Sequence, residues 1–231
     1  MNDSVVIGIE GLVGSGKTSI SKELLKYIPN SILLHGGNIY RAIVYTMMNF
    51  KPDIKNMMKE AKDLDITKIM EQINLEVKLE DRETVVYVAG KKMKSQDLQS
   101  QESSIAVSAV SNVADNKKLY EFGKKLIDKF RKDYNVILSS RDIVRMYPDV
   151  TYHFFITADL KERVKRKFIQ YKEEIPIEQI KQTIISRDEL QQKSGYYDIH
   201  KITQVIDVTD CKDVSESTER VLKHVKIEAT V

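Results

Sequence analysis

The sequence predicts an α/β protein in which a parallel sheet is flanked by helices. Short apolar runs rich in β-branched residues recur along the chain, as "VVIGI", "SILLHGG", "NVILSS", "TYHFFIT" and "QVIDVT". Segments with helical spacing separate several of these runs, at about residues 16–27, 159–171 and 177–192. Because buried strands that alternate with helices pair in parallel, we expect a central sheet covered by helices.

The first strand leads into a glycine-rich turn and a helix. Residues 5–9 form the apolar run, and "IEGLVGSGKT" at residues 9–18 follows it directly. Apolar residues then recur at helical spacing until Pro29 ends the helix. This stretch fits the pattern G-x-x-x-x-G-K-[ST], with a strand before it and a helix after it, and so predicts a phosphate-binding loop.

Each residue type in this loop has a chemical reason. Glycines let backbone N–H groups approach phosphate oxygens, and the first turn of the helix adds unpaired donors and the positive end of its dipole. A lysine supplies a cation to the outer phosphates, and a threonine hydroxyl is a hard oxygen ligand for Mg²⁺. We therefore expect ATP to bind at Gly11, Gly14, Ser15, Gly16, Lys17, Thr18 and Ser19, with Lys17 catalytic and Thr18 the metal ligand.

The composition changes between about residues 52 and 134. A lysine-rich helical segment is followed by "INLEVKL", the charged turn "EDRE" and "TVVYVAG", whose alternating apolar positions predict an antiparallel hairpin. In "KKLYEFGKKLIDKFRKD", Leu119, Phe122, Leu126, Ile127 and Phe130 share one helical face. We expect residues 52–134 to be a small lobe inserted into a core made of residues 1–51 and 135–231.

Composition narrows the class of protein. The 37 basic and 34 acidic residues of the 231 nearly cancel, leaving a net charge of +3 that does not favour a nucleic-acid partner. Cys211 is the only cysteine and the four histidines show no metal-ligand spacing, so neither a disulfide nor such a metal cluster is predicted. No apolar run approaches the ~20 residues of a membrane span. We expect a cytoplasmic monomer whose partners are small nucleotide substrates, without a secretory leader, nucleic acid or membrane.

Later segments separate a phosphotransferase from a guanine-nucleotide switch. The switch requires Asn-Lys-x-Asp after a strand, and the nearest match, "DNKKLYE", lacks both the aspartate and the strand. The helices near the C-terminal end are instead rich in lysine and arginine. Positive charge that converges on a migrating phosphoryl group is what transfer between two nucleotides requires.

Several segments in order resemble the cytidylate kinases of the bacterial type. "GLVGSGKTSISKELLK" resembles that family's opening loop and helix, and "GGNIYRAI" is similar to its "DTGAMYRA" segment. "SIAVSAVSNVA" resembles its serine-bearing helix, and "ILSSRDIVRMYPDVTYHFFITADLKERVKRK" resembles its "GRDIGTVVFPDA" stretch and lid. The resemblance implies a P-loop kinase core with an inserted acceptor-binding lobe that carries the hairpin, and ATP-dependent transfer to CMP or dCMP.

The resemblance also implies roles for single residues. The substrate-binding residues would be Arg41 for the acceptor phosphate, Ser111 for the acceptor base, and Arg141 with Asp142 after a buried strand. Arg163 and Arg166, three residues apart on one helical face, would be catalytic residues of a lid at about residues 161–176. Arg187, in the "RD" helix, would be a further catalytic phosphate ligand.

The sequence departs from this family on the acceptor side. Lys193 is the only cation near the end of "RDELQQKSGYY", and a lysine cannot reproduce a bidentate arginine contact. Leu119 and Tyr120 stand where the family has an arginine, and "SRDIV" replaces "GRDIG". The acceptor therefore stays open among CMP, dCMP, UMP and another small molecule. A nucleotide-binding protein that has lost its acceptor site is the non-catalytic alternative.

Overall fold

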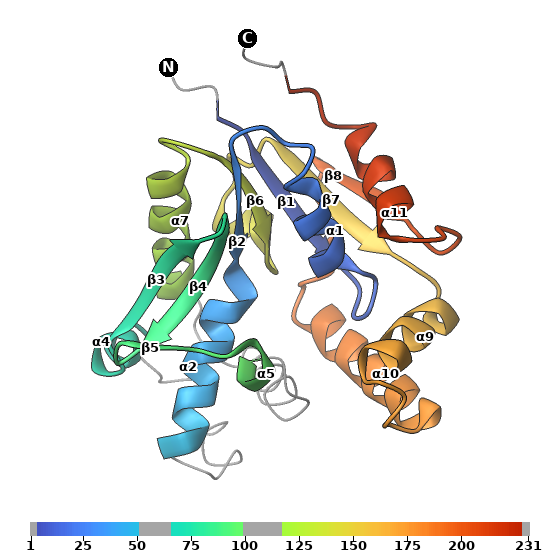
Figure 1. Cartoon of the computed structure of the whole chain (residues 1–231), viewed down its shortest axis with the longest axis horizontal. Coiled ribbons are helices and arrows are strands. Elements are labelled where there is room, and N and C mark those ends of the chain that lie inside the picture. Colours follow the sequence, from blue (N-terminus) through green and yellow to red (C-terminus); the bar gives the residue numbers. More distant parts are fainter. Residues whose placement is uncertain (1–3, 51–65, 99–116, 228–231) are drawn as a thin grey trace. The chain divides into compact units, whose positions relative to one another are not determined.

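The computed structural model describes residues 4–50, 66–98 and 117–227 (Figure 1). The chain divides into two compact units: Met1–Leu33 with Phe130–Val231, and Leu34–Lys129. The second unit is thus continuous in sequence, and along the chain it separates the two segments that form the first unit. Its bounds differ from the predicted lobe of residues 52–134, and an acceptor-binding role for that lobe stays a prediction.

The first unit contains a parallel sheet. Its strands are β1 (Val6–Gly11), β6 (Asn135–Ser139), β7 (Tyr152–Thr157) and β8 (Thr203–Asp207). They lie in the order β6-β1-β7-β8, and each neighbouring pair is parallel. This arrangement confirms the predicted parallel α/β sheet and places the chain segments that follow β1, β6 and β7 at the same edge of it.

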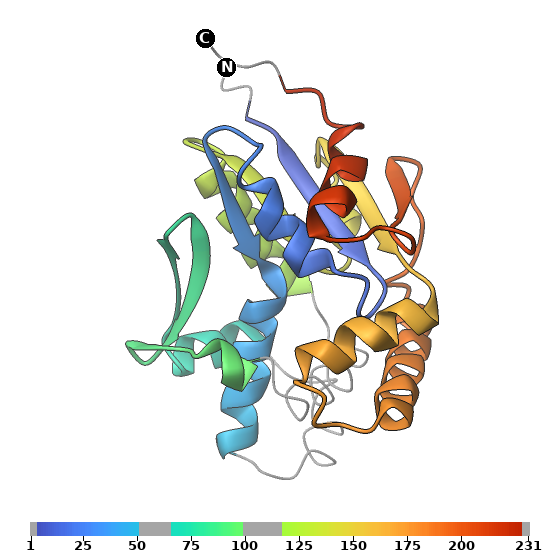
Figure 2. The same cartoon turned by 45° about the vertical axis from the view of Figure 1, so that its right-hand side comes forward.

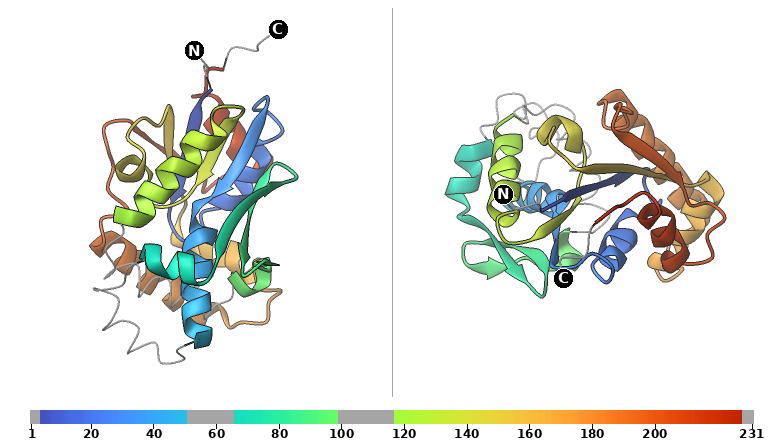
Figure 3. Two further views of the ribbon diagram at one scale, coloured as in Figure 1. Left: turned by 90° about the vertical axis from the view of Figure 1, so that its left-hand side faces the viewer. Right: turned by 90° about the horizontal axis from the view of Figure 1, so that it is seen from above.

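Helices cover this sheet. On one face α1 (Lys17–Leu24) packs beside α11 (Val214–Leu222), as Figure 3 shows from above. Two longer helices, α9 (Leu160–Gln170) and α10 (Ile177–Lys193), pack against each other (Figure 2). The short helix α8 (Ile143–Met146) follows β6.

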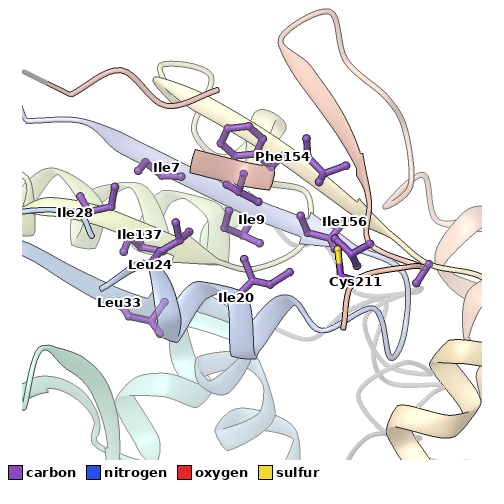
Figure 4. Packing of buried hydrophobic residues seen from close by; sticks show 14 residues of the cluster. Ile7, Ile9, Ile20, Leu24, Ile28, Leu33, Ile137, Phe154, Ile156 and Cys211 are labelled. Atoms are coloured by element: carbon purple, nitrogen blue, oxygen red, sulfur yellow. The ribbon is translucent and has the colours of Figure 1, made fainter. Parts of the chain in front are cut away.

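The hydrophobic core of this unit lies between the sheet and α1. Ile7 and Ile9 of β1 point toward Ile20 and Leu24 of α1, with Phe154 of β7 beside them (Figure 4). All five side chains are at most 1% exposed. Burial of each contributes roughly 2 kcal/mol, so this face fixes α1 on the sheet.

The intervening residues of β1 face the opposite side of the sheet. Strand side chains alternate between faces, which places Gly8 and Glu10 away from α1. A side chain at Gly8 would meet His153 and Ile143 at 3.0 Å, so this face is packed closely around α8. Glu10 therefore lies in a buried environment that an ionisable side chain occupies only with partners.

The second unit contains the predicted hairpin. Strands β3 (Leu75–Glu80) and β4 (Glu83–Val88) are antiparallel, and β5 (Lys91–Lys92) pairs with β4. Asp81 and Arg82 of the turn have φ of +46° and +66°, the left-handed pair that a two-residue hairpin turn needs. The hairpin prediction is confirmed.

The other described elements of this unit are helices. They are α2 (Gly36–Phe50), α4 (Ile66–Gln72), α5 (Ser95–Leu98) and α7 (Lys117–Phe130), while β2 (Ser31–His35) crosses the boundary between the units. On α7, Leu126, Ile127 and Phe130 are buried, which confirms the predicted apolar face.

Two helix boundaries differ from the prediction. Helix α1 ends at Leu24 instead of extending to residue 27, because Leu25, Lys26 and Tyr27 form tighter i→i−3 hydrogen bonds before Pro29. Helix α2 begins at Gly36, so the two glycines that end the predicted strand run "SILLHGG" belong to the helix. None of the helices in the described ranges is long and apolar enough to cross a membrane.

Candidate active site

The glycine-rich loop starts where β1 contacts the backbone of β7. Gly11 has φ of +148°, and a Cβ atom built on it would lie 2.2 Å from the carbonyl oxygen of Ile156. The next residue, Leu12, donates its N–H to that same oxygen at 3.0 Å. Only glycine fits here, because any side chain would collide with the neighbouring strand.

The loop then passes close to α9 before α1 begins. Gly14 has φ of +80°, and a Cβ there would lie 3.2 Å from the carbonyl oxygen of Arg163. Gly16 has φ of +100° and caps α1 in the left-handed conformation. The backbone conformation therefore favours glycine at all three predicted positions, and close neighbouring atoms also restrict the space at Gly11 and Gly14.

The first turn of α1 carries the predicted polar residues. Lys17 is partly buried, while Thr18 and Ser19 are exposed. No acidic side chain lies in this turn. Helix N-termini present N–H groups without intrahelical acceptors, together with the positive end of the helix dipole, and so favour anions. Ser15, just before the helix, is buried, and within the described residues its hydroxyl has no hydrogen-bond partner.

Arg163 of α9 contacts the loop and not the solvent. It is 7% exposed, and its Nε donates to the carbonyl oxygen of Ala158 at 2.9 Å. Its Nη1 donates to the carbonyl oxygen of Val13 at 3.1 Å and to a carboxylate oxygen of Asp188. The structure thus brings Arg163 to the loop, and its contact with a phosphate stays a prediction.

Arg166, one turn further along α9, also contacts this loop. Its Nη1 donates to the carbonyl oxygen of Ser15 at 2.9 Å, and its Nη2 donates to that of Val208 at 2.8 Å. Nε donates to Glu162 at 3.0 Å. The nearest atom to a Cβ built on Gly16 would be Nη1 of Arg166, at 3.7 Å. A positive charge therefore lies beside the start of α1.

Two further predicted arginines, Arg141 and Arg187, interact through their charges, and Arg141 contacts the loop. Arg141 donates from Nη1 to the carbonyl oxygen of Gly11, and its guanidinium carbon lies 5.6 Å from the ring centre of Tyr197. Arg187 of α10 is partly buried, and within the described residues its Nε has no hydrogen-bond partner. Burial, and then the charge of Arg141, lower the pKa of Arg187. An anion between these two cations would relieve both effects.

Asp142 occupies the turn between β6 and α8. It is buried, with φ of +54°, and its Oδ1 lies 3.5 Å from Nη1 of Arg145. The amide of Ile143, the next residue, donates to Oε1 of Glu10 at 2.5 Å. The predicted pair Arg141–Asp142 is thus joined to the end of β1 on both sides of the turn.

The remaining predicted acceptor residues belong to the second unit or lie outside the described ranges. Arg41 of α2 donates from Nη1 to the carbonyl oxygen of Leu98 at 2.9 Å. Ser111 lies outside the described residues. Their roles stay predictions.

Several of the described residues that contact the loop or its flanking turn were absent from the predicted site. They include Glu10, Asp188 and Tyr197, whose hydroxyl donates to Asp188 at 2.6 Å. An acidic residue inside the apolar strand "VIGIE" was the available signal for Glu10, because a buried carboxylate requires partners. No sequence spacing connects Asp188 or Tyr197 to residue 13, which is far away along the chain.

A glycine loop between a strand and a helix, with arginines against it at the edge of a parallel sheet, defines a protein of the P-loop class. Within this class the chain belongs to the cytidylate kinase family, whose model matches residues 7–227. It is 29% identical to the cytidylate kinase of Aquifex aeolicus, with 94% of each chain covered. It is 27% identical to that of Alkaliphilus oremlandii, over 96% of this chain and 98% of the relative.

Within the described residues no group of three histidine, cysteine or carboxylate side chains is placed to hold a metal ion. Mg²⁺ prefers hard oxygen ligands, which include hydroxyl groups and phosphate oxygens. The exposed hydroxyl of Thr18, a hard oxygen donor on the first turn of α1, fits that donor set.

Proposed function

We propose that this protein transfers the γ-phosphoryl group of ATP to CMP or dCMP. Family membership supports the reaction class, since the relatives are named cytidylate kinases. The observation that carries the proposal is the pair Arg141 and Arg187 at the base of the loop. The repulsion between their charges favours a bound anion there, as does the Nε of Arg187, which has no hydrogen-bond partner among the described residues.

The donor would bind along the loop and the start of α1. Backbone N–H groups of the glycine turn would contact the phosphates, and Lys17 would contact the outer ones. Mg²⁺, held through the Thr18 hydroxyl, would neutralise charge on the phosphate oxygens. Arg166 adds a cation beside Gly16, so the loop would be surrounded by positive charge where the transition state concentrates negative charge.

The acceptor needs little chemical activation. An oxygen of the CMP phosphate would attack the γ-phosphorus, and the bond between that phosphorus and the bridging oxygen of ADP would break. The acceptor phosphate is largely ionised at neutral pH, so no general base is required. Arg141 and Arg187 would position the acceptor phosphate or the migrating group, and catalysis would consist of positioning and charge neutralisation.

An acceptor panel tests this proposal. The purified protein is incubated with MgATP and, in separate reactions, CMP, dCMP, UMP or a shikimate-like alcohol, and ADP and the phosphorylated product are quantified. We expect ADP and CDP in equal amounts with CMP. Turnover of another acceptor without turnover of CMP would replace the cytidylate assignment. ATP binding without transfer to any acceptor would support the non-catalytic alternative.

A further inference from the structure

We propose that Asp188 is a positioning residue for the phosphate-binding loop and that it acts through the backbone of Val13. Arg163 and Tyr197 are its partners in this role. The inference rests on the proposed function in one respect, namely that ATP binds to this loop. The proposal explains how the loop keeps its shape. In it, Arg163 has a structural role, because it bonds to the loop and to Asp188.

The carboxylate of Asp188 joins three segments of the chain. Its Oδ1 accepts from the amide of Val13 at 3.2 Å and from the hydroxyl of Tyr197 at 2.6 Å. Its Oδ2 accepts from Nη1 of Arg163, and this same nitrogen donates to the carbonyl oxygen of Val13. Both backbone polar groups of Val13 are therefore bonded to the two members of one ion pair.

Bonds to Val13 act in the middle of the glycine-rich loop. This residue lies between Gly11 and Gly14, whose backbones are less restricted than those of other residues. Its side chain is also buried, against Val164, Ile180 and Ile184 of α9 and α10. Hydrogen bonds to the amide and the carbonyl of Val13 fix the orientation of the two peptide groups that flank this residue, and both belong to the loop.

The charges in this cluster balance each other. Asp188 would weaken anion binding if its charge acted alone near the phosphates, but Arg163 lies against it and is 7% exposed. Conversely, the donors of Arg163 are directed to Ala158, Val13 and Asp188. Arg163 thus contributes to nucleotide binding by holding the loop. Arg166 also bonds to the loop, and its guanidinium, which is paired with Glu162, lies beside Gly16.

Three variants separate this role from a general effect on stability. Asp188→Asn keeps the shape of the side chain but removes its charge. Tyr197→Phe removes one donor and leaves the ion pair intact. Glu189→Gln is the matched control, because it removes an acidic charge from the adjacent, exposed position on α10. Each variant is measured for hydrogen exchange at the Val13 amide without nucleotide, for the Kd of MgATP and for KM with CMP.

We expect Asp188→Asn to accelerate exchange at Val13 and to raise the Kd of MgATP about 10- to 100-fold, as for loss of a charge-assisted hydrogen bond. Tyr197→Phe should raise the Kd about threefold, and it keeps the test usable if Asp188→Asn folds poorly. Neither should change the KM for CMP by more than about twofold. Glu189→Gln should match the parent protein in all three measurements.

A double-mutant cycle tests the shared role of Arg163 and Asp188. We expect Arg163→Gln combined with Asp188→Asn to weaken ATP binding about as much as either change alone, because both remove one structural unit. Additive effects would show that Arg163 acts on the phosphates independently and would overturn the proposal. So would an Asp188→Asn protein indistinguishable from Glu189→Gln. If the parent protein bound no ATP, the proposed function would fail, while exchange at Val13 would still decide the positioning role.

Discussion

Oε1 of Glu10, the residue before the loop, accepts a hydrogen bond from the amide of Ile143 at 2.5 Å. Glu10 is 4% exposed and Ile143 is fully buried. The same oxygen lies 3.2 Å from Nε2 of His153, whose Nδ1 is bonded to the Thr203 hydroxyl at 2.8 Å. One carboxylate thus joins the end of β1 to the turn that carries Arg141 and Asp142.

Replacing this carboxylate should destabilise the protein. Glu10→Ala leaves the Ile143 amide without its acceptor in a buried site, and we expect a loss of about 3 kcal/mol in the free energy of unfolding, measured with urea. Glu10→Gln keeps an amide oxygen for Ile143 and should lose only about 1 kcal/mol. An alanine variant as stable as the glutamine variant would show that the hydrogen bond does not stabilise this turn.

Lys17 should be essential for phosphoryl transfer. Lys17→Ala removes the predicted cation from the start of α1, and we expect kcat/KM to fall at least about 100-fold in an assay of ADP release. Lys22→Ala, at an exposed position on the same helix, is the control and should stay within about twofold of the parent value. Full activity of Lys17→Ala would remove this loop from the mechanism.

Two glycines should respond in opposite ways to alanine. Gly11→Ala places a Cβ against the carbonyl oxygen of Ile156 at a φ of +148°, so we expect a loss of about 3 kcal/mol in thermal or urea unfolding. Among the described residues outside the local backbone of α2, no heavy atom lies within 4 Å of a Cβ built on Gly37. Gly37→Ala should therefore stabilise the protein by about 0.5 kcal/mol. Equal responses of the two variants would contradict this reading of the loop.

Tyr197 should make stability depend on alkaline pH. Burial is the main cause that raises the pKa of the Tyr197 hydroxyl above its ordinary value of 10.0, so the folded protein keeps a proton that the unfolded chain releases. The unfolded state then binds fewer protons, and the contribution of Tyr197 to stability, complete below pH 10, decreases as pH rises above it.

Comparison with Tyr197→Phe isolates that contribution, because the other tyrosines and lysines titrate in both proteins. At pH 8 the variant should be less stable by about 1 kcal/mol, the value of one hydrogen bond. The difference should shrink between pH 10 and pH 11 in urea unfolding. A difference that stays constant with pH would show that the hydroxyl ionises normally in the folded state.

The parallel sheet and the hairpin could be predicted because their signals are local. Continuous and alternating apolar runs predicted β1, β4 and β7. The charged stretch predicted the hairpin turn, which the structure places at Asp81 and Arg82. The loop was equally visible, since its three glycines occupy positions that demand a positive φ. Period and turn chemistry are properties of neighbouring residues, so the sequence alone carries them.

The partners of the predicted site residues could not be derived in this way. Arg163 lies on a basic helix, and the basic residues of that helix were predicted to bind phosphate. No neighbouring residue in the sequence indicates that Arg163 bonds to Val13 and Asp188. The hydrogen bond between Val13 and Asp188 joins residues 175 positions apart. Such contacts arise only when β1, α9 and α10 meet in three dimensions.

The bonds of Arg163 and Arg166 have a mechanical consequence for the predicted lid at residues 161–176. Both side chains donate hydrogen bonds to the loop, Arg163 to the carbonyl oxygen of Val13 and Arg166 to that of Ser15, so the first two turns of α9 are attached to it. A rigid swing of the whole segment would break these bonds. If this segment is a lid, we therefore expect its hinge to lie beyond Arg166 and the moving part to be shorter than residues 161–176.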